Sequence, residues 1–117
     1  MPYVDGFLVA IPQKRLADYK KLARKAGKIW LEYGALEYVE CIADDVPVGK
    51  VTSFPKAVKL KDDEVVAFSW IVYKSRSDRD AILKKVMADP RLHKDMADMP
   101  FDGKRMIYGG FKTIVEM

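Results

Sequence analysis

The chain has 117 residues, of which 50% are hydrophobic and 32% charged, and its formal net charge is +4. This length predicts one domain over residues 1–117 with its own core, and so small a charge does not argue for a polyanionic partner. Because Cys41 is the only cysteine, an intrachain disulfide and a cysteine-based metal cluster are excluded, which fits a reducing compartment.

The first half of the chain predicts a strand, a helix and a second strand. The first strand spans about residues 3–11 and is closed by Pro12. A helix is expected over about residues 14–33, where apolar side chains recur every three or four positions, and Gly34 is a suitable stop. Apolar residues alternate with others over about residues 36–43, which predicts the second strand.

The second half repeats this order after a long connection over residues 44–64. A strand is predicted over residues 65–73, and a helix over about residues 78–89 with Ser77 as its N-cap. Beyond the Asp89-Pro90 break we expect a short turn and then a final strand, with Leu92, Met96 and Met99 in the turn and about residues 106–115 in the strand.

The connection over residues 44–64 is unusually long for a compact domain. Prolines and glycines interrupt it, while Val51, Phe54 and Val58 are side chains that favour burial. We expect an ordered arm that packs on its own subunit or on a partner and closes one mouth of a cavity between sheet and helices.

Two strands are too apolar to have one solvated face. The stretch from Val65 to Tyr73 has one small polar residue, Ser69, and the stretch from Tyr3 to Ile11 has one charge, Asp5. Strands with one wet face alternate apolar and polar residues, so both stretches are expected to be buried on both sides. The chain is too short to cover both sides with its own helices, and we therefore expect a homodimer.

The order of elements predicts an α+β fold of the ferredoxin-like βαββαβ type. In this plait a four-stranded antiparallel sheet carries two helices on one face. The other face would expose large apolar side chains, a patch that monomers rarely tolerate in water. Pairing two such faces gives a dimeric α+β barrel.

Membrane insertion and secretion are not expected. No apolar run approaches the roughly 20 residues that span a bilayer. The N-terminus has no basic region, and Asp5 interrupts its apolar stretch early, which is unlike a signal peptide. We expect a cytoplasmic protein.

Five segments carry a resemblance to a known family: Leu36–Asp45, Thr52–Pro55, Phe68–Tyr73, Val86–Pro90 and Met99–Phe111. They are similar to the YbaA-like family of small uncharacterised bacterial proteins, over essentially the whole chain. The resemblance implies a dimeric α+β barrel. It implies no particular activity, because that superfamily includes cofactor-less monooxygenases, haem-degrading enzymes, haem peroxidases and plain ligand-binding modules.

A haem site is not expected from this resemblance. Haem-degrading members of the superfamily carry a polar residue on the first strand, a tryptophan on the third and a histidine on the helix that follows. Asp5 and Trp70 match the first two positions, but His93 lies beyond the Asp89-Pro90 break. We expect no cofactor.

The hypothesis for a ligand site is a pocket on the helix side of the sheet. Trp30, Trp70 and Phe54 would bound it, and Asp5 and His93 would orient polar groups of a small molecule. The alternative is that the aromatic residues are core and that His93 is a surface residue in a charged turn. No metal is expected, because one histidine and one cysteine cannot supply a zinc shell within one chain.

Two further features have alternative interpretations. Glu40 could be a buried carboxylate that moves protons, but we favour a strand-edge position with its charge in water or paired with Lys112 or Arg105. Gly109-Gly110 lies inside a strand, which indicates a bulge or a close backbone approach rather than a phosphate cradle.

Two functions from different classes remain open. The first is a homodimeric small-molecule-binding module, with or without cofactor-less enzyme activity. The second is a non-catalytic interaction module associated with RNA through the basic outer face of the first helix, which carries Lys14, Arg15, Lys20, Lys21, Arg24, Lys25 and Lys28. Nucleic-acid binding is the less favoured interpretation, because the strands carry no recognised aromatic–basic RNA motif.

Overall fold

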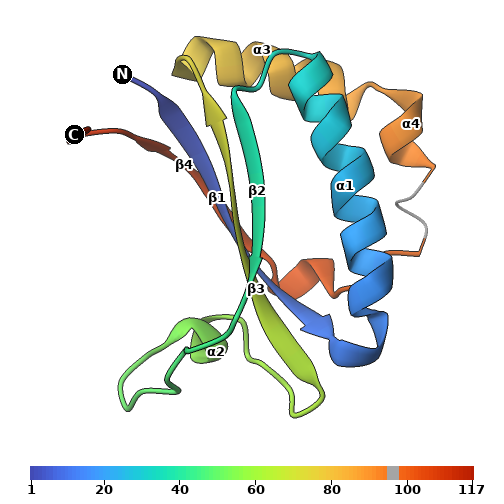
Figure 1. Ribbon diagram of the computed structural model, residues 1–117, viewed down its shortest axis with the longest axis vertical. Coiled ribbons are helices and arrows are strands. Elements are labelled where there is room, and N and C mark those ends of the chain that lie inside the picture. Colours follow the sequence, from blue (N-terminus) through green and yellow to red (C-terminus); the bar gives the residue numbers. More distant parts are fainter. Residues whose placement is uncertain (95–97) are drawn as a thin grey trace.

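The protein folds around one four-stranded antiparallel sheet with its two long helices on one face (Figure 1). The computed structural model describes residues 1–94 and 98–117, so Met96 of the expected turn lies outside the described residues. In chain order the elements are β1 (Tyr3–Pro12), η1 (Gln13–Arg15), α1 (Leu16–Glu32), β2 (Glu37–Ile42), α2 (Phe54–Ala57), β3 (Glu64–Tyr73), α3 (Arg76–Met87), α4 (Pro90–His93), η2 (Gly103–Arg105) and β4 (Ile107–Lys112).

The strand order is β2-β3-β1-β4, and every neighbouring pair is antiparallel. The two most apolar strands, β1 and β3, are the central pair, aligned from Tyr3 opposite Tyr73 to Pro12 opposite Glu64. The shorter β2 and β4 form the edges of the sheet. The four-stranded antiparallel α+β architecture predicted from the sequence is therefore confirmed.

The main core lies between the sheet and the two long helices. Its largest cluster joins α1 and α3 to β3 and contains Ala26, Ile29, Trp30, Ala35, Ile71, Tyr73, Ile82 and Val86. A second cluster near the start of α1 contains Val9, Ile11, Tyr19, Ala23 and Ala67. The odd-numbered residues of β3 thus face the helices, and its even-numbered residues face the opposite side.

A glycine lets α1 approach β2 closely. A Cβ atom on Gly27 would lie 2.8 Å from the ring of Tyr38, so a larger residue would push the helix away from the sheet. The helix stops where the sequence predicted, since Gly34 follows it with a φ of +114° that favours glycine.

The second long helix begins earlier than the sequence predicted. Its N-cap is Ser75, whose extended backbone lets Oγ accept a hydrogen bond from the N–H of Asp78 at 3.1 Å. Ser77 lies inside the first turn instead. The error arose because a serine followed three residues later by an aspartate occurs twice in succession, at Ser75–Asp78 and at Ser77–Asp80.

Residues 44–64 form an ordered arm that packs on its own chain. Val58 is 1% exposed and packs with Ala10 and Val66. These two strand residues point away from the helices, so the arm lies on the side of the sheet opposite α1 (Figure 1). The expectation that it closes a cavity on the helix side is therefore wrong. Its short helix α2 was missed because the Phe54-Pro55 pair resembles a break, although proline suits the first turn of a helix.

The last strand is shorter than predicted and ends at Lys112. Thr113 turns back to the carbonyl oxygen of Pro2, to which its Oγ1 donates at 2.6 Å. The side chains of Ile114 and Val115 are exposed rather than part of the sheet. Among the described residues, no helix is long and apolar enough to cross a membrane.

Candidate functional site

The side of the sheet away from α1 and α3 is a nearly continuous apolar surface, which we call the open face. Antiparallel pairing places three rows of residues across it: Phe111–Val4–Val72–Glu37, Gly109–Gly6–Trp70–Val39 and Ile107–Leu8–Phe68–Cys41. Glu37 is the only charged residue in these rows. Because each β-strand alternates its sides, the same strands present the core on their other face.

The open face is hollowed along β1 and β4. The hollow, which we call the trough, has a volume of about 520 Å³ and is lined by Val4, Gly6, Phe7, Leu8, Phe68, Trp70, Ile107, Tyr108, Gly109 and Phe111. All of these residues are apolar, aromatic or glycine. Pockets for small molecules typically measure about 300–1,000 Å³ and are mostly apolar, so the trough has the size and lining of such a site.

An aromatic row borders the trough on the side of the arm. The rings of Phe54 and Phe68 meet edge to face with their centroids 5.9 Å apart, and those of Phe68 and Trp70 are 5.7 Å apart. The indole Nε1 of Trp70 donates to Glu37 at 2.9 Å, which satisfies the one polar group of this row. The arm thus contributes one ring to the wall of the open face.

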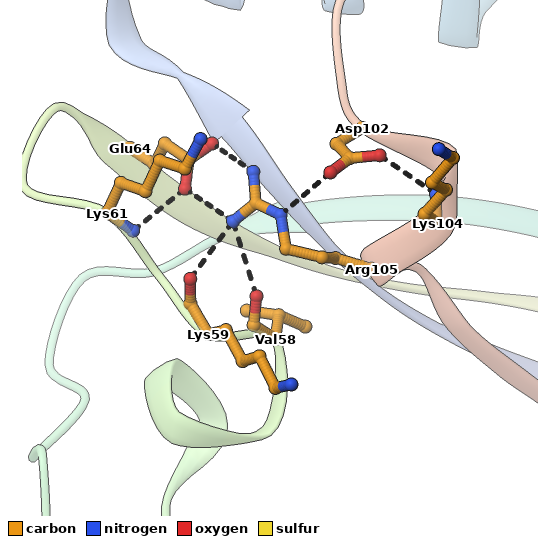
Figure 2. Close-up of polar contacts among 7 residues, drawn as sticks. All are labelled: Val58, Lys59, Lys61, Glu64, Asp102, Lys104 and Arg105. Carbon is orange, nitrogen blue, oxygen red and sulfur yellow. Dashed lines mark hydrogen bonds and ion pairs between the residues drawn. The ribbon is translucent and has the colours of Figure 1, made fainter.

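An arginine holds the arm against the sheet (Figure 2). The Arg105 guanidinium donates to the two carboxylate oxygens of Glu64 at 2.8 and 2.6 Å and to Asp102 at 3.0 Å. It also donates to the carbonyl oxygens of Val58 at 3.4 Å and Lys59 at 3.0 Å. We call this group the Arg105 clamp; it joins the arm, the start of β3 and the segment before β4.

The Arg105 clamp is largely shielded from water. The side chains of Arg105 and Glu64 are 15% and 4% exposed. The guanidinium lowers the pKa of Glu64, and the N–H of Lys61, which donates to the same carboxylate at 2.8 Å, acts in the same direction. A buried ion pair adds little net stability compared with apolar residues of similar volume, but its many directional hydrogen bonds fix the positions of the groups that they join. The clamp therefore sets where the arm lies.

On the other side of the sheet, Asp5 is buried with polar partners. Its side chain lies 3.7 Å from Nε of Arg79 and makes a hydrogen bond with Tyr73, whose hydroxyl accepts from Nε1 of Trp30 at 3.1 Å. Burial raises the pKa of Asp5, and the bond with Tyr73 and the charge of Arg79 oppose this rise. Asp5 and Trp30 therefore belong to the packed helix-side core.

Gly110 gives Arg79 room to reach this cluster. A Cβ atom on Gly110 would lie 2.5 Å from Nη2 of Arg79 and would also collide with the hydroxyl of Tyr3. The guanidinium lies over the Tyr3 ring, 5.1 Å from its centroid. The close backbone approach expected at Gly109-Gly110 is thus confirmed for Gly110.

A second carboxylate, Glu40, is partly buried and faces α1 from β2. It accepts hydrogen bonds from the hydroxyls of Tyr19 at 2.7 Å and Tyr38 at 3.0 Å. Burial raises the pKa of Glu40, and hydrogen bonds from Tyr19, Tyr38 and Ser69 oppose this rise. The favoured interpretation of Glu40 as a solvated or cation-paired carboxylate is therefore wrong. Its partners are neutral hydroxyls between the helix and the sheet.

The five residues of the predicted pocket do not come together. Asp5 and Trp30 lie on the helix side, whereas Trp70 and Phe54 lie on the open face. His93 is exposed on α4, with Nε2 2.6 Å from a carbonyl oxygen at the end of α3. A single pocket bounded by all five is geometrically wrong, because no site can face both sides of one sheet. Ligand binding beside Trp70 and Phe54 stays a prediction.

Three residues organise the open face, and sequence reasoning missed Gly6 and Glu64 and offered Arg105 as a partner of Glu40 rather than of Glu64. Gly6 stands in the middle of an apolar strand, and a glycine there commonly marks a close approach to the backbone, so this signal was available. Glu64 and Arg105 gave no such signal, because 41 residues separate them in the chain.

The fold and its open face define the class of protein: a small α+β protein with one antiparallel sheet, helices on one side and an apolar surface on the other. The family model described as "Protein of unknown function (DUF1428)" matches residues 2–103. The chain belongs to this family, and the resemblance to YbaA-like proteins is confirmed.

Relatives of the same length support this assignment. The chain is 53% identical over 116 residues to "Uncharacterized protein YbaA" of Escherichia coli strain K12, with 99% of each chain covered. It has the same identity and coverage with the YbaA protein of Shigella flexneri. Neither name specifies a ligand or a reaction.

A solved structure shares the fold at much lower identity. The crystal structure of an uncharacterized NIPSNAP domain protein from Burkholderia xenovorans matches with a TM-score of 0.54 and 14% identity, covering 95% of this chain and 93% of that chain. This likeness bears on the fold alone and agrees with the α+β architecture.

Proposed function

We propose that the protein is a homodimeric small-molecule-binding module whose two copies pair through their open faces. Each copy is then a ferredoxin-like plait, and the pair is a dimeric α+β barrel in the cytoplasm, where the exposed thiol of Cys41 stays reduced. The observation that carries the proposal is the open face, an apolar sheet surface that the described residues cover only at the end where the arm lies.

The exposure of this surface supports pairing. Phe68, Ile107 and Phe111 are 44%, 43% and 65% exposed and lie on the same face of the sheet, on the two strands that flank β1. Contiguous apolar patches of this kind mark interaction sites, whereas isolated exposed apolar residues need no explanation. The second copy of the chain is the partner whose surface matches this one in both chemistry and extent.

The size of the open face also suits a dimer. Its two central strands have ten residues each and its two edge strands six each, which at about 3.3 Å per residue and about 4.8 Å per strand gives a flat area of roughly 500 Å². The accessible area of a surface with projecting side chains exceeds its flat area. A standard interface buries about 800 Å² per partner, which is within reach.

The proposed function is binding rather than catalysis. The trough offers a small molecule an apolar lining without any charged side chain, whereas the buried Asp5 and the partly buried Glu40 face the other side of the sheet. Proton transfer needs a titratable group within reach of the substrate. The trough is lined by no carboxylate, amine or imidazole, and the Tyr108 phenol is its one titratable group, so apolar burial supplies the affinity.

A charge placed on the open face tests the pairing. We expect Phe68→Asp to convert the dimer to a folded monomer in sedimentation velocity, because a buried, unpaired carboxylate strongly disfavours the interface. Leu31→Asp is the matched control, since Leu31 is 48% exposed but lies on α1. The pairing is contradicted if Phe68→Asp keeps the mass of the wild-type dimer, or if Leu31→Asp dissociates it equally.

A second candidate function rests on the outer face of α1. A surface hollow there is lined by Ala17, Lys20, Lys21, Arg24, Lys25 and Lys28. The row Lys20, Arg24, Lys28 places like charges four residues apart, which destabilises a helix by about 0.2–0.5 kcal/mol per pair. Phosphate groups would relieve this repulsion. We propose as the alternative a non-catalytic module that binds single-stranded RNA.

Fluorescence anisotropy with a labelled oligouridine tests this alternative. Reversing the charges of Lys20, Arg24 and Lys28 should abolish binding, and wild-type affinity should fall steeply as salt rises from about 50 to 200 mM. The matched control reverses Lys84 and Lys85 on α3. Absence of wild-type binding at about 50 mM salt, or equal loss in both variants, removes the RNA function.

A further inference from the structure

Two glycines form the floor of the trough. Gly6 of β1 and Gly109 of β4 are directly opposite each other in the antiparallel register. Both lie in the interior of their strands and line the 520 Å³ hollow. Side by side, they remove two neighbouring side chains from an otherwise bulky apolar surface, which leaves a flat patch of backbone that the edge of the Phe111 ring approaches.

Among residues 1–94 and 98–117, none requires glycine at these two positions. Neither residue has a positive φ; the glycines that do are Gly34 and Gly49. A Cβ atom on Gly6 or Gly109 would meet only the ring of Phe111, at 3.8 Å, which is ordinary van der Waals contact. Gly27 and Gly110 differ, because a Cβ atom there would collide with neighbouring groups.

The two glycines therefore carry a cost that the single chain does not explain. Glycine inside a strand is less favourable than alanine by roughly 0.5–1 kcal/mol, because its unfolded backbone is freer and it packs no side chain. Glycine in a strand commonly marks a place where a ligand or another chain approaches the backbone. The approach here must come from the open face, because that is where both missing side chains would point.

Apolar side chains surround this glycine floor on three sides: the two neighbouring rows of the open face, and the β3 side, where Trp70 lies. Phe111 and Val4 flank the floor in one row, Ile107 and Leu8 in the other, and Trp70 stands next to Gly6. At the outer end the floor reaches β4, which is an edge strand. The shape is a flat slot between apolar walls, with one end at the border of the sheet.

We infer that this slot binds a neutral, planar aromatic molecule that lies flat on the Gly6–Gly109 backbone. The inference rests on the proposed function, because in the proposed dimer the sheet of the second copy would cover the side of the slot that faces away from the glycines. Peptide planes and aromatic rings offer such a molecule flat, polarisable contacts. A charged molecule would be buried without a partner, because no charged side chain lines the trough.

Two fluorescent probes and a pair of substitutions test this inference. The probes are neutral N-phenyl-1-naphthylamine and its charged analogue 8-anilinonaphthalene-1-sulfonate. The variant is Gly6→Ala combined with Gly109→Ala, whose methyl groups would lift a ring off the floor. The control is Gly103→Ala, because a Cβ atom on Gly103 has nothing within 4 Å. Light scattering and thermal unfolding are measured on every sample.

We expect the wild-type dimer to bind the neutral probe at least tenfold more tightly than the sulfonate. The double variant should remain a dimer, unfold at the same or a higher temperature, and bind the neutral probe at least tenfold more weakly, while Gly103→Ala binds it as the wild type does. These three results together support an aromatic ligand on the glycine floor.

Other outcomes overturn the inference in distinguishable ways. A wild-type monomer removes the proposed function itself. A wild-type dimer that binds neither probe, or a double variant that binds as well as the wild type, removes the glycine floor and leaves the dimer. A double variant that dissociates assigns the floor to a side chain of the second copy instead of a ligand.

Discussion

The two faces of the sheet differ in how their apolar side chains are covered. On the helix side, the carboxylates have partners from the same chain: Glu40 accepts from Tyr19 and Tyr38, and Asp5 lies beside Tyr73 and Arg79. On the open face the rows are apolar, and Phe68 and Phe111 remain substantially exposed. One face is complete within a single chain, and the other is not.

This difference teaches where to look for function. A face completed by its own chain uses Glu40 to hold α1 and Asp5 to hold α3 against the sheet, so the raised pKa values of these carboxylates are a structural consequence of their burial. An incomplete face has surface left for a partner or a ligand. For this reason the proposed binding site lies on the open face, although the helix side carries the buried carboxylate.

The largest expected effect comes from removing the Arg105 clamp, which holds the arm on the open face. Arg105→Ala leaves the buried Glu64 carboxylate without its cation and releases the arm. We expect the Tm to fall by at least about 10 °C, measured by circular dichroism. Lys104→Ala, a change at the exposed neighbouring residue, should leave the Tm within about 2 °C. Equal effects of the two substitutions would show that the clamp does not hold the arm.

The same clamp predicts an acid sensitivity. Arg105 lowers the folded-state pKa of Glu64 below its unfolded value, so the clamp contributes stability above the unfolded pKa and loses it as pH falls through the folded one. The Tm difference between wild type and Arg105→Ala should therefore shrink as the pH falls below about 4. A difference that stays constant down to pH 2 would contradict this account of Glu64.

An intermediate effect is expected on the helix side. Tyr19→Phe removes the hydroxyl that donates to Glu40, and a hydrogen bond to a charged group contributes about 1.5–3 kcal/mol. Urea unfolding should show a loss of that order. Tyr108→Phe is the control, since Tyr108 is 70% exposed and its hydroxyl loss should cost less than about 0.5 kcal/mol. If the two variants unfold alike, Glu40 does not lock α1 to the sheet.

The smallest effect concerns Asp5, whose pKa burial raises. A raised folded-state pKa means that the ionised form weakens the fold at neutral pH and that this penalty vanishes below the unfolded pKa of about 3.8. Asp5→Asn should therefore raise the Tm at pH 7 by at most about 5 °C, with no gain at pH 3. The exposed Asp62→Asn in the arm serves as the control. A lower Tm at pH 7 would mean that the Arg79 pairing outweighs desolvation.

Much of the fold was predictable because it depends on hydrophobic pattern. The continuous apolar runs of β1 and β3 identified the central strands, and the three- and four-residue spacing of apolar side chains identified α1. Burial on two sides, however, erases the alternation that tells one face from the other. For this reason the sequence could not show that Trp70 faces away from the helices while Ile71 faces them.

The candidate site was less predictable for the same reason. Pairing of Gly6 with Gly109 depends on the register between the two ends of the chain. The Arg105–Glu64 contact depends on how the arm returns to the sheet, which no local spacing encodes. Glu40 was misjudged because an edge strand usually places polar side chains in water, whereas here α1 covers one side of β2.

The incompleteness of the open face is the central claim, and the native mass of the wild-type protein tests it most directly. Multi-angle light scattering at micromolar concentration should give about twice the chain mass of 13.3 kDa, unchanged on dilution across the micromolar range. A single species of 13.3 kDa at every concentration would contradict the claim, because the open face would then be stable in water without a second copy.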